Sequence, residues 1–159
     1  MTAEIPCPSD SPTVLEGQKS IRILVVDDHA RLRQTLRSMI EDCDYMTVVG
    51  EASNGLEAIH AVPDAHPDVV VMDINMPVMN GIEATKRIKA EFPDVAIIGL
   101  SVHNEREFIQ EMQAAGVSSY LTKGSSIDRL CQAIEEAAIS YGWSRVSIRN
   151  LPHDAPEIR

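Results

Sequence analysis

The sequence predicts an α/β fold in which a five-stranded parallel sheet lies between two layers of helices. Short apolar runs of strand length alternate with longer segments whose apolar residues recur at helical spacing. The short runs are almost wholly hydrophobic, which is typical of strands buried on both faces of a parallel sheet. Proline, glycine and capping residues fall where one pattern gives way to the next.

The composition fits one domain with a core of its own. The chain has 159 residues, of which 44% are apolar and 4% aromatic, so the core should be aliphatic. The formal net charge of −10 argues against a free-standing nucleic-acid binder. Metal cations or basic protein surfaces suit this charge better.

The cysteines and the hydropathy pattern bear on the compartment. Cys7, Cys43 and Cys131 are widely spaced, form no CxxC pair and are interpreted as free thiols in a reducing compartment. No signal peptide is evident, and no apolar stretch approaches the roughly 18 residues needed to cross a bilayer. We therefore expect a soluble, cytoplasmic protein with no membrane partner.

Regular structure is predicted to begin at Ile21. Residues 1–20 carry several prolines and no apolar period, and are expected to be a flexible N-terminal extension. The run "IRILVV" is a predicted strand. A helix should follow, because apolar residues recur on one face at Leu32, Leu36, Met39 and Ile40.

The middle of the chain contains three more predicted strands: "YMTVVGEA", "DVVVMD" and "DVAIIGLS". The helix "SNGLEAIHAV" should start at a capping pair, Asn54 and Glu57. The third and fourth strands follow Pro67 and Pro93. Proline cannot continue a helix and biases the residue before it toward extended geometry, so the same local arrangement is expected at both places.

The remaining elements complete the alternation. A helix face is predicted at Ala84, Ile88 and Phe92. The next helix, "NEREFIQEMQAAG", has acidic residues near its start and Gly116 as its expected stop. "SSYLTK" is the fifth strand. The last helix should be capped by Ser125 with Asp128, and its apolar face consists of Ile127, Leu130, Cys131, Ile134 and Ala138.

Polar residues gather at the carboxyl ends of the predicted strands, the edge where such sheets bind ligands. Asp27 and Asp28 follow the first strand, Asp73 ends the third, Ser101 ends the fourth and Lys123 follows the fifth. Each has a local explanation when taken alone. Acids and serines cap helices or begin turns, and a lysine is usually a solvated surface residue. Their joint position at one edge favours a site.

The chemistry of such a site follows from its charges. Clustered carboxylates need a cation, and Mg²⁺ takes oxygen ligands together with phosphate. A carboxylate can also attack phosphorus, and phosphoryl transfer needs mainly positioning and charge neutralisation. Asp73 is the candidate nucleophile, with Asp27 and Asp28 on the metal. His29 and His103 are not taken as ligands, because they lack partners at ligand spacing.

Four motifs carry a family resemblance: "LVVDDHARLR", "DVVVMDINMPVMNGIEA", "IIGLSVH" and "GVSSYLTKGSS". On these motifs, residues 21–140 closely resemble the receiver domain of bacterial two-component response regulators, and their wording is most similar to the NarL/FixJ subgroup. The resemblance implies a flavodoxin-like, doubly wound fold with strand order 2-1-3-4-5. It implies a phosphoprotein that takes its phosphoryl group from a sensor histidine kinase or a histidine phosphotransfer protein.

The resemblance also implies roles for individual residues. Asp73 would be the phosphoacceptor, and Mg²⁺ would be bound by Asp28, Asp73 and the backbone carbonyl of Asn75, with Asp27 acting through water. Ser101 and Tyr120 match the switch pair of the family. Lys123 matches the lysine that contacts the phosphoryl group. The chemistry of the chain itself would be autophosphotransfer and slow autodephosphorylation, so it is not expected to be a dedicated enzyme.

Three departures from the family pattern matter. Gly124 stands where many receivers have proline in a cis bond, and the bulk of Val102 after the switch serine is expected to hinder attack on the phosphoryl group. The subgroup usually continues into a helix-turn-helix domain, whereas residues 141–159 resemble only the linker toward it. We therefore expect this chain to signal by contact with a downstream protein. We expect no DNA binding by this chain alone. The sequence does not decide whether the chain forms a homodimer.

Two alternatives remain. A haloacid-dehalogenase-like phosphatase also uses an aspartate nucleophile, Mg²⁺ and a lysine, but its nucleophile follows the first strand as DxD, where this chain has "DDH". A degenerate receiver could serve as a phosphorylation-independent docking module. Turnover of a generic phosphate ester would favour the phosphatase, and failure to accept phosphate from a small donor would favour the docking module.

Overall fold

The computed structural model describes residues 20–102 and 104–142, and five strands and five helices alternate along them. The strands are β1 (Ile21–Val26), β2 (Met46–Ala52), β3 (Val69–Asp73), β4 (Ala96–Ser101) and β5 (Ser119–Thr122). The helices are α1 (Ala30–Glu41), α2 (Gly55–Ala65), α3 (Gly81–Glu91), α4 (Arg106–Ala115) and α5 (Ile127–Ser140). The predicted alternation is confirmed. Cys7, His103, most of the N-terminal extension and residues 143–159 lie outside the described residues.

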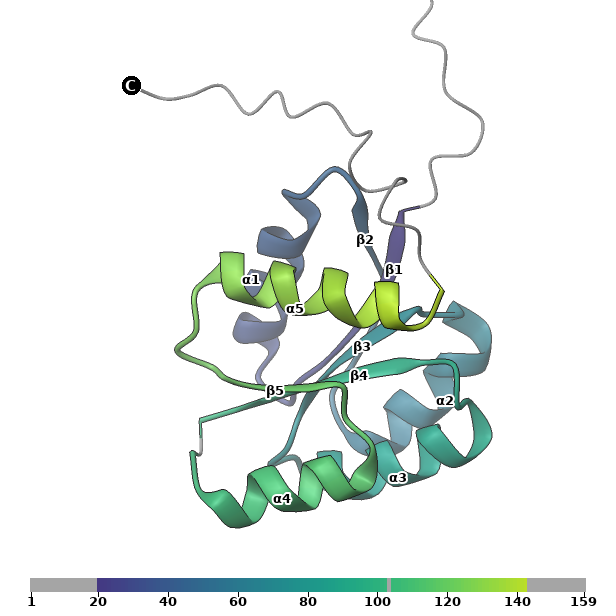
Figure 1. The fold of residues 1–159 in the computed structure, drawn as a ribbon, viewed down its shortest axis with the longest axis vertical. Helices are drawn as coiled ribbons and strands as arrows, with labels where there is room; N and C mark the ends of the chain where they lie inside the picture. Colours follow the sequence, from purple (N-terminus) through teal and green to yellow (C-terminus); the bar gives the residue numbers. More distant parts are fainter. Residues whose placement is uncertain (1–19, 103, 143–159) are drawn as a thin grey trace, which may run out of the picture.

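The strands form one parallel sheet in the order β2-β1-β3-β4-β5, as the flavodoxin-like prediction requires (Figure 1). β1 and β3 are neighbours near its centre, with Val26 paired to Met72. The residues that follow these two positions are Asp27 and Asp73. The topology therefore brings the acidic ends of two strands side by side, although Asp27 and Asp73 are 46 positions apart in the chain.

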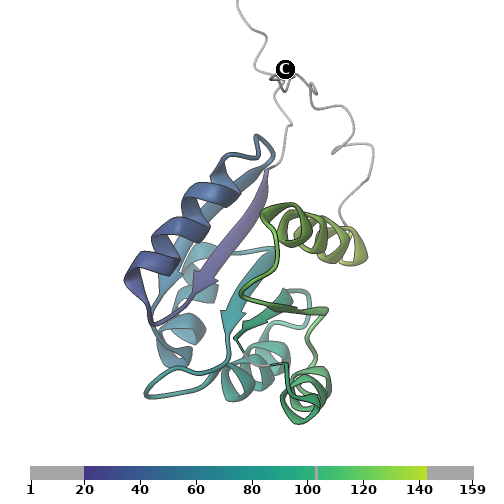
Figure 2. The same ribbon diagram turned by 90° about the vertical axis from the view of Figure 1, so that its left-hand side faces the viewer.

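Helices cover both faces of the sheet (Figure 2). Alternate residues of β1 supply the two sides: Ile23 and Val25 pack with the α1 and α5 layer, whereas Leu24 and Val26 pack with α2 and α3. A third cluster lies under α4 around Met112. The core is aliphatic, as the low aromatic content predicted. Within the described part of the chain, no helix has the length and hydropathy to cross a membrane.

Both helices end before their proline and both strands begin after it, as predicted, but the two junctions do not share one local arrangement, so that part of the prediction is wrong. α2 continues through Pro63 to Ala65 and ends at His66, which is left-handed with φ 48° and not extended. The Arg22 guanidinium donates hydrogen bonds to the carbonyls of Ala65 and His66, at 2.6 and 3.1 Å. A contact with β1 thus fixes the backbone that Pro67 alone would have left extended.

Helix caps follow the prediction with small shifts. Asn54 accepts the Glu57 backbone N–H at 2.9 Å, as predicted, while the Glu57 carboxylate accepts from Ser53. The cap of α5 is Ser126 and not Ser125, because Ser126 is extended and accepts the N–H of Arg129. Met39, which was predicted to lie on the apolar face of the first helix, is 36% exposed. Gly116 ends α4 with φ 104°, as expected.

Candidate functional site

An acidic cluster lies at the carboxyl edge of the sheet, where β1 and β3 end. Asp27, Asp28, His29 and Asp73 each offer a ligand atom, and these atoms lie within 4.8 Å of one another. Asp27 is 1% and Asp73 4% exposed, and the Asp28 side chain is 27% exposed. The site therefore gathers negative charge in a place from which most water is excluded.

Lys123 supplies an ammonium group to this cluster. Its Nζ lies 2.7 Å from Asp27 Oδ2 and 3.2 Å from Asp73 Oδ2. Burial disfavours the ammonium, but hydrogen bonds to and charges on Asp27 and Asp73 outweigh burial and raise the pKa of Lys123. The Lys123 backbone N–H also donates to the Ser101 carbonyl at 2.8 Å, which ties the ends of β4 and β5 together.

The Lys123 ammonium compensates the negative charge of the Asp73 carboxylate only in part. Burial, and then the charge of Asp27, raise the pKa of Asp73 to about 6 against the opposing effect of Lys123. The carboxylate is still the main form at neutral pH, as a nucleophile requires. The ionised Asp73 nevertheless lowers the stability of the folded state, because a buried charge has lost its hydration.

The first prediction concerns this cost. The folded state keeps the Asp73 proton up to about pH 6, whereas the unfolded chain loses it near 3.8, so the free energy of unfolding falls as pH rises between these values. Asp73→Asn should remove this slope and raise the free energy of unfolding at pH 7 by up to about 3 kcal/mol, with no gain at pH 3.5. Urea denaturation with a chelator present measures it. An equal gain at both pH values would exclude a charge effect.

His29 belongs to the cluster, although its sequence context did not mark it. Its Nδ1 lies 3.1 Å from Asp28 Oδ1 and 3.3 Å from Asp27 Oδ1, and its backbone N–H donates to Asp27 Oδ1 at 2.8 Å. The signal that could have found it is its position. His29 is the N-cap residue of α1, so it sits where the chain turns over the carboxyl edge.

The other predicted site residues lie around this centre. Ser101 is buried at the end of β4, next to β3 in the sheet. Tyr120 on β5 is partly buried against the cluster of Met112 and Ala115 under α4. Asn75 is exposed in the loop after β3, two residues beyond Asp73.

The donor set of the cluster suits a hard divalent cation. The buried Oδ1 of Asp28 makes no hydrogen bond of good geometry with a described residue, and its nearest polar contact there is His29 Nδ1 at 3.1 Å. Such an atom favours a positive partner, and three carboxylates that share one lysine ammonium match the oxygen ligands that Mg²⁺ prefers. The residues of the cluster therefore fit a magnesium site.

The loop after β3 passes close to Asp73 and contains one strained residue. Val78 has φ 68°, a conformation that a β-branched side chain rarely adopts, and its side chain is 79% exposed. No burial compensates for this strain.

The second prediction is that Val78→Asn raises the free energy of unfolding by about 1 kcal/mol, because asparagine tolerates the left-handed region. Val102→Asn is the matched control, since Val102 is also exposed, at 70%, but has no positive φ. Chemical denaturation of both variants decides the matter. Equal changes in the two variants would show that backbone strain is not the cause.

Comparisons with known proteins agree with this geometry. A family model described as "Response regulator receiver domain" matches residues 23–135. Response regulator GacA of Pseudomonas viridiflava is 39% identical over 114 residues, which cover 72% of this chain and 53% of that protein. The nitrate/nitrite response regulator protein NarL of Escherichia coli K12 is 34% identical over 124 residues, which cover 78% of this chain and 57% of that protein.

Solved structures show the same fold. A LuxR-family two-component response regulator from Aurantimonas sp. SI85-9A1 aligns with a TM-score of 0.73 and 36% identity, over 77% of this chain and 87% of that one. The chain spans about half the length of the curated relatives it matches. The predicted likeness to NarL-type receivers is confirmed. The chain belongs to the response regulator receiver domain family of two-component signalling proteins.

Proposed function

We propose that this chain receives a phosphoryl group on Asp73 and passes the signal on by protein contact. The observation that carries the proposal is the pairing of Asp73, a buried carboxylate, with the Lys123 ammonium at 3.2 Å inside an acidic cluster. A nucleophile, a cation for the incoming phosphoryl oxygens and carboxylates for a metal are thus in one place. These are the parts that phosphoryl transfer needs.

The transfer follows from these positions. An oxygen of Asp73 forms a bond to phosphorus while the phosphorus–nitrogen bond of a phosphohistidine donor breaks, and the imidazole keeps the electron pair. The Lys123 ammonium shifts its contact from the carboxylates to a phosphoryl oxygen as the negatively charged phosphoryl group arrives on Asp73. The buried edge limits access of water, which slows hydrolysis of the acyl phosphate. The donor would be a sensor histidine kinase or a histidine phosphotransfer protein.

Mg²⁺ would be held by Asp28, Asp73 and the backbone carbonyl of Asn75, and there it would neutralise charge on the phosphoryl oxygens. Asp27 is the least available acid, because Lys123 lies 2.7 Å from its Oδ2. The third prediction is therefore that Asp28→Ala weakens Mg²⁺ affinity by about 10-fold or more, while Asp27→Ala weakens it less. NMR titration with Mg²⁺ measures both variants. Equal losses would contradict the ranking.

Ser101 and Tyr120 are proposed to transmit the signal. A hollow of about 470 Å³ beside β5 is lined by Tyr120 together with Ile109 of α4 and Arg129 of α5, so Tyr120 borders a surface that its movement would reshape. A shift of the Ser101 hydroxyl toward the phosphoryl group would let the ring turn inward and change this face. Hydrogen exchange with beryllofluoride should show altered protection over residues 101–123. Changes confined to other segments would contradict this role.

Residues 21–140 would act as the receiver, with 1–20 as an extension and 141–159 as a linker-like tail. The partner downstream is a protein, and a gel-shift assay at physiological salt should detect no DNA binding by this chain alone. Sub-micromolar affinity for any duplex would contradict that statement.

Acetyl phosphate tests the function itself. In the presence of Mg²⁺, the intact mass of the chain should increase by one phosphoryl group, and Asp73→Asn should take up none. Asp64→Asn is the matched control, because Asp64 lies in the last turn of α2, outside the cluster. No uptake by the parent chain would favour the docking module. Steady turnover of a generic phosphate ester would favour the phosphatase.

A further inference from the structure

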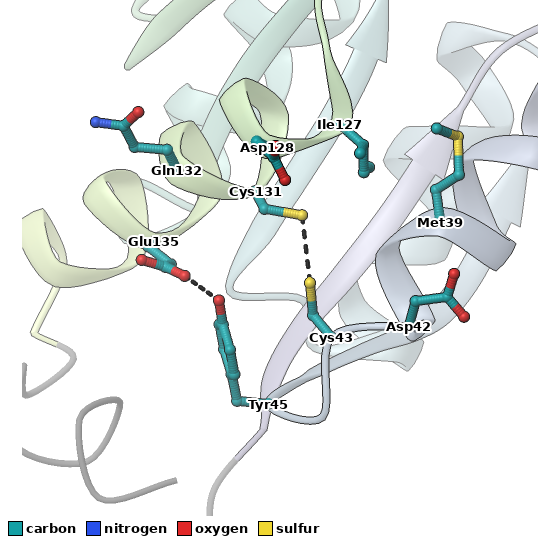
Figure 3. Close-up of a pocket in the computed structure, with 9 residues that line it drawn as sticks. All are labelled: Met39, Asp42, Cys43, Tyr45, Ile127, Asp128, Cys131, Gln132 and Glu135. Atoms are coloured by element: carbon teal, nitrogen blue, oxygen red, sulfur yellow. Dashed lines mark hydrogen bonds between the residues drawn. The ribbon is translucent and has the colours of Figure 1, made fainter. Parts of the chain in front are cut away.

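Two cysteines that are 88 positions apart in the chain meet on the side of the sheet covered by α1 and α5. The Sγ atoms of Cys43 and Cys131 lie 3.4 Å apart (Figure 3). Cys43 is half-buried in the turn between α1 and β2, and Cys131 is buried on the inner face of α5. Both are free thiols.

The surroundings hold these two sulfurs together and leave one of them reachable. The Tyr45 hydroxyl donates a hydrogen bond to the Glu135 carboxylate, so a second contact joins the same turn to the same helix (Figure 3). The pair lines a hollow of about 430 Å³, with Met39 and Ile127 on its walls. A small molecule can therefore approach Cys43 from solvent more readily than Cys131, which is only 8% exposed.

We propose that Cys43 and Cys131 form a reversible intramolecular disulfide when the protein meets a hydroperoxide. A disulfide needs the sulfurs at about 2.05 Å, so they must close by a little over 1 Å. Cys43 lies in a turn, where a small backbone adjustment suffices for this movement. The proposal is independent of the phosphorylation site, because the turn and the acidic cluster lie at opposite ends of α1. The 12 residues of α1 span about 18 Å.

The reaction proceeds in two steps. The Cys43 thiol gives up its proton and the thiolate attacks the terminal oxygen of the hydroperoxide. The O–O bond breaks, Cys43 becomes a sulfenic acid, and the departing alkoxide takes up a proton to leave as the alcohol. The sulfur of Cys131 then attacks Cys43, the S–O bond breaks, and the departing hydroxide takes the Cys131 proton to form water. Two thiols are oxidised by two electrons, and one hydroperoxide is reduced to an alcohol and water. A small dithiol reverses the change by thiol–disulfide exchange.

The surroundings of the two cysteines decide which of them reacts first with the hydroperoxide. Burial, the neighbouring Cys43 and the carboxylates of Glu135 and Asp128 raise the pKa of the Cys131 thiol to about 12. A thiol held protonated and covered is a poor first nucleophile. It can still act as the resolving partner, since it needs to reach only the sulfur 3.4 Å away.

The test uses the full chain with Cys7→Ser, so that Cys43 and Cys131 are the thiols under study. After hydrogen peroxide, non-reducing peptide mapping should link Cys43 to Cys131 within one chain, and the mass should fall by two hydrogens. The Tm should rise by roughly 5–15 °C, since the bond closes a loop of 88 residues, and a dithiol should restore it.

Single-cysteine variants in the same background separate the roles. Cys131→Ala should accumulate a sulfenic acid on Cys43 that dimedone traps, and Cys43→Ser should leave Cys131 unreactive until urea unfolds the chain. Any of three results would overturn the proposal: a disulfide between chains, a stable Cys43 sulfenic acid in the presence of Cys131, or oxidation only after unfolding. The last result would mean that the two thiols serve as packing groups alone.

Discussion

Gly81→Ala is expected to lower the free energy of unfolding by about 3 kcal/mol and to distort the site. Gly81 begins α3 directly against the end of β3. A Cβ at this position would lie 2.0 Å from the carbonyl oxygen of Asp73 and 3.0 Å from Cα of Ile74, and both of these are backbone atoms. The Gly81 N–H also donates to the Ile74 carbonyl at 2.8 Å, which fixes this close approach.

Gly124→Ala is the matched control for this substitution. A Cβ on Gly124 would meet nothing within 4 Å, so its effect should stay within about 0.5 kcal/mol, although Gly124 also lies next to a site residue. Urea denaturation gives both values, and acetyl phosphate labelling shows whether Asp73 has moved. Equal stability of the two variants would mean that β3 and α3 do not approach each other in this way.

Lys123→Met is expected to lower the free energy of unfolding at pH 7 by about 2–4 kcal/mol and the labelling rate by about 100-fold. The ammonium is within 3.2 Å of two buried carboxylates, and methionine keeps its apolar stem while removing the charge. Without it, Asp27 and Asp73 repel each other uncompensated. The pKa of Asp73 should then rise further above its already elevated value.

The loss of stability in Lys123→Met should shrink as pH falls from the raised Asp73 pKa of the variant to the value of about 6 in the parent chain, or when Mg²⁺ replaces the missing charge. Lys86→Ala is the control, because Lys86 is exposed on α3. Stability curves at pH 5 and pH 7, with and without Mg²⁺, measure the effect. A loss of stability that depends on neither pH nor Mg²⁺ would point to lost packing and not to lost charge.

The fold and the main site residues could be predicted because their signals are local. The run "VVVMD" ends on a charged residue, and Asp73 therefore had to lie at the carboxyl edge once β3 was recognised as a strand. Asp27 and Asp28 follow from the same rule applied to β1. The acidic residues of β1 and β3 then lie close together, because neighbouring strands of a parallel sheet end at the same edge.

Other features depend on contacts that no local pattern encodes. Cys43 and Cys131 meet only because the turn after α1 packs on α5, so their spacing in the chain gave no hint of a pair. His66 is left-handed because Arg22, from a distant strand, holds the neighbouring carbonyls. Either serine could cap α5, and Ser126 takes that role while Ser125 hydrogen-bonds to Thr122.

The most direct measurement is the chemical identification of the residue that carries the phosphoryl group. After acetyl phosphate and Mg²⁺, borohydride reduction of the acyl phosphate followed by peptide mass spectrometry converts the modified aspartate to homoserine and locates it. A single homoserine at position 73 is the expected result. Homoserine at position 27 or 28 with Asp73 unchanged, or a phosphoryl group on a histidine, would contradict the assignment of Asp73 as the phosphoacceptor.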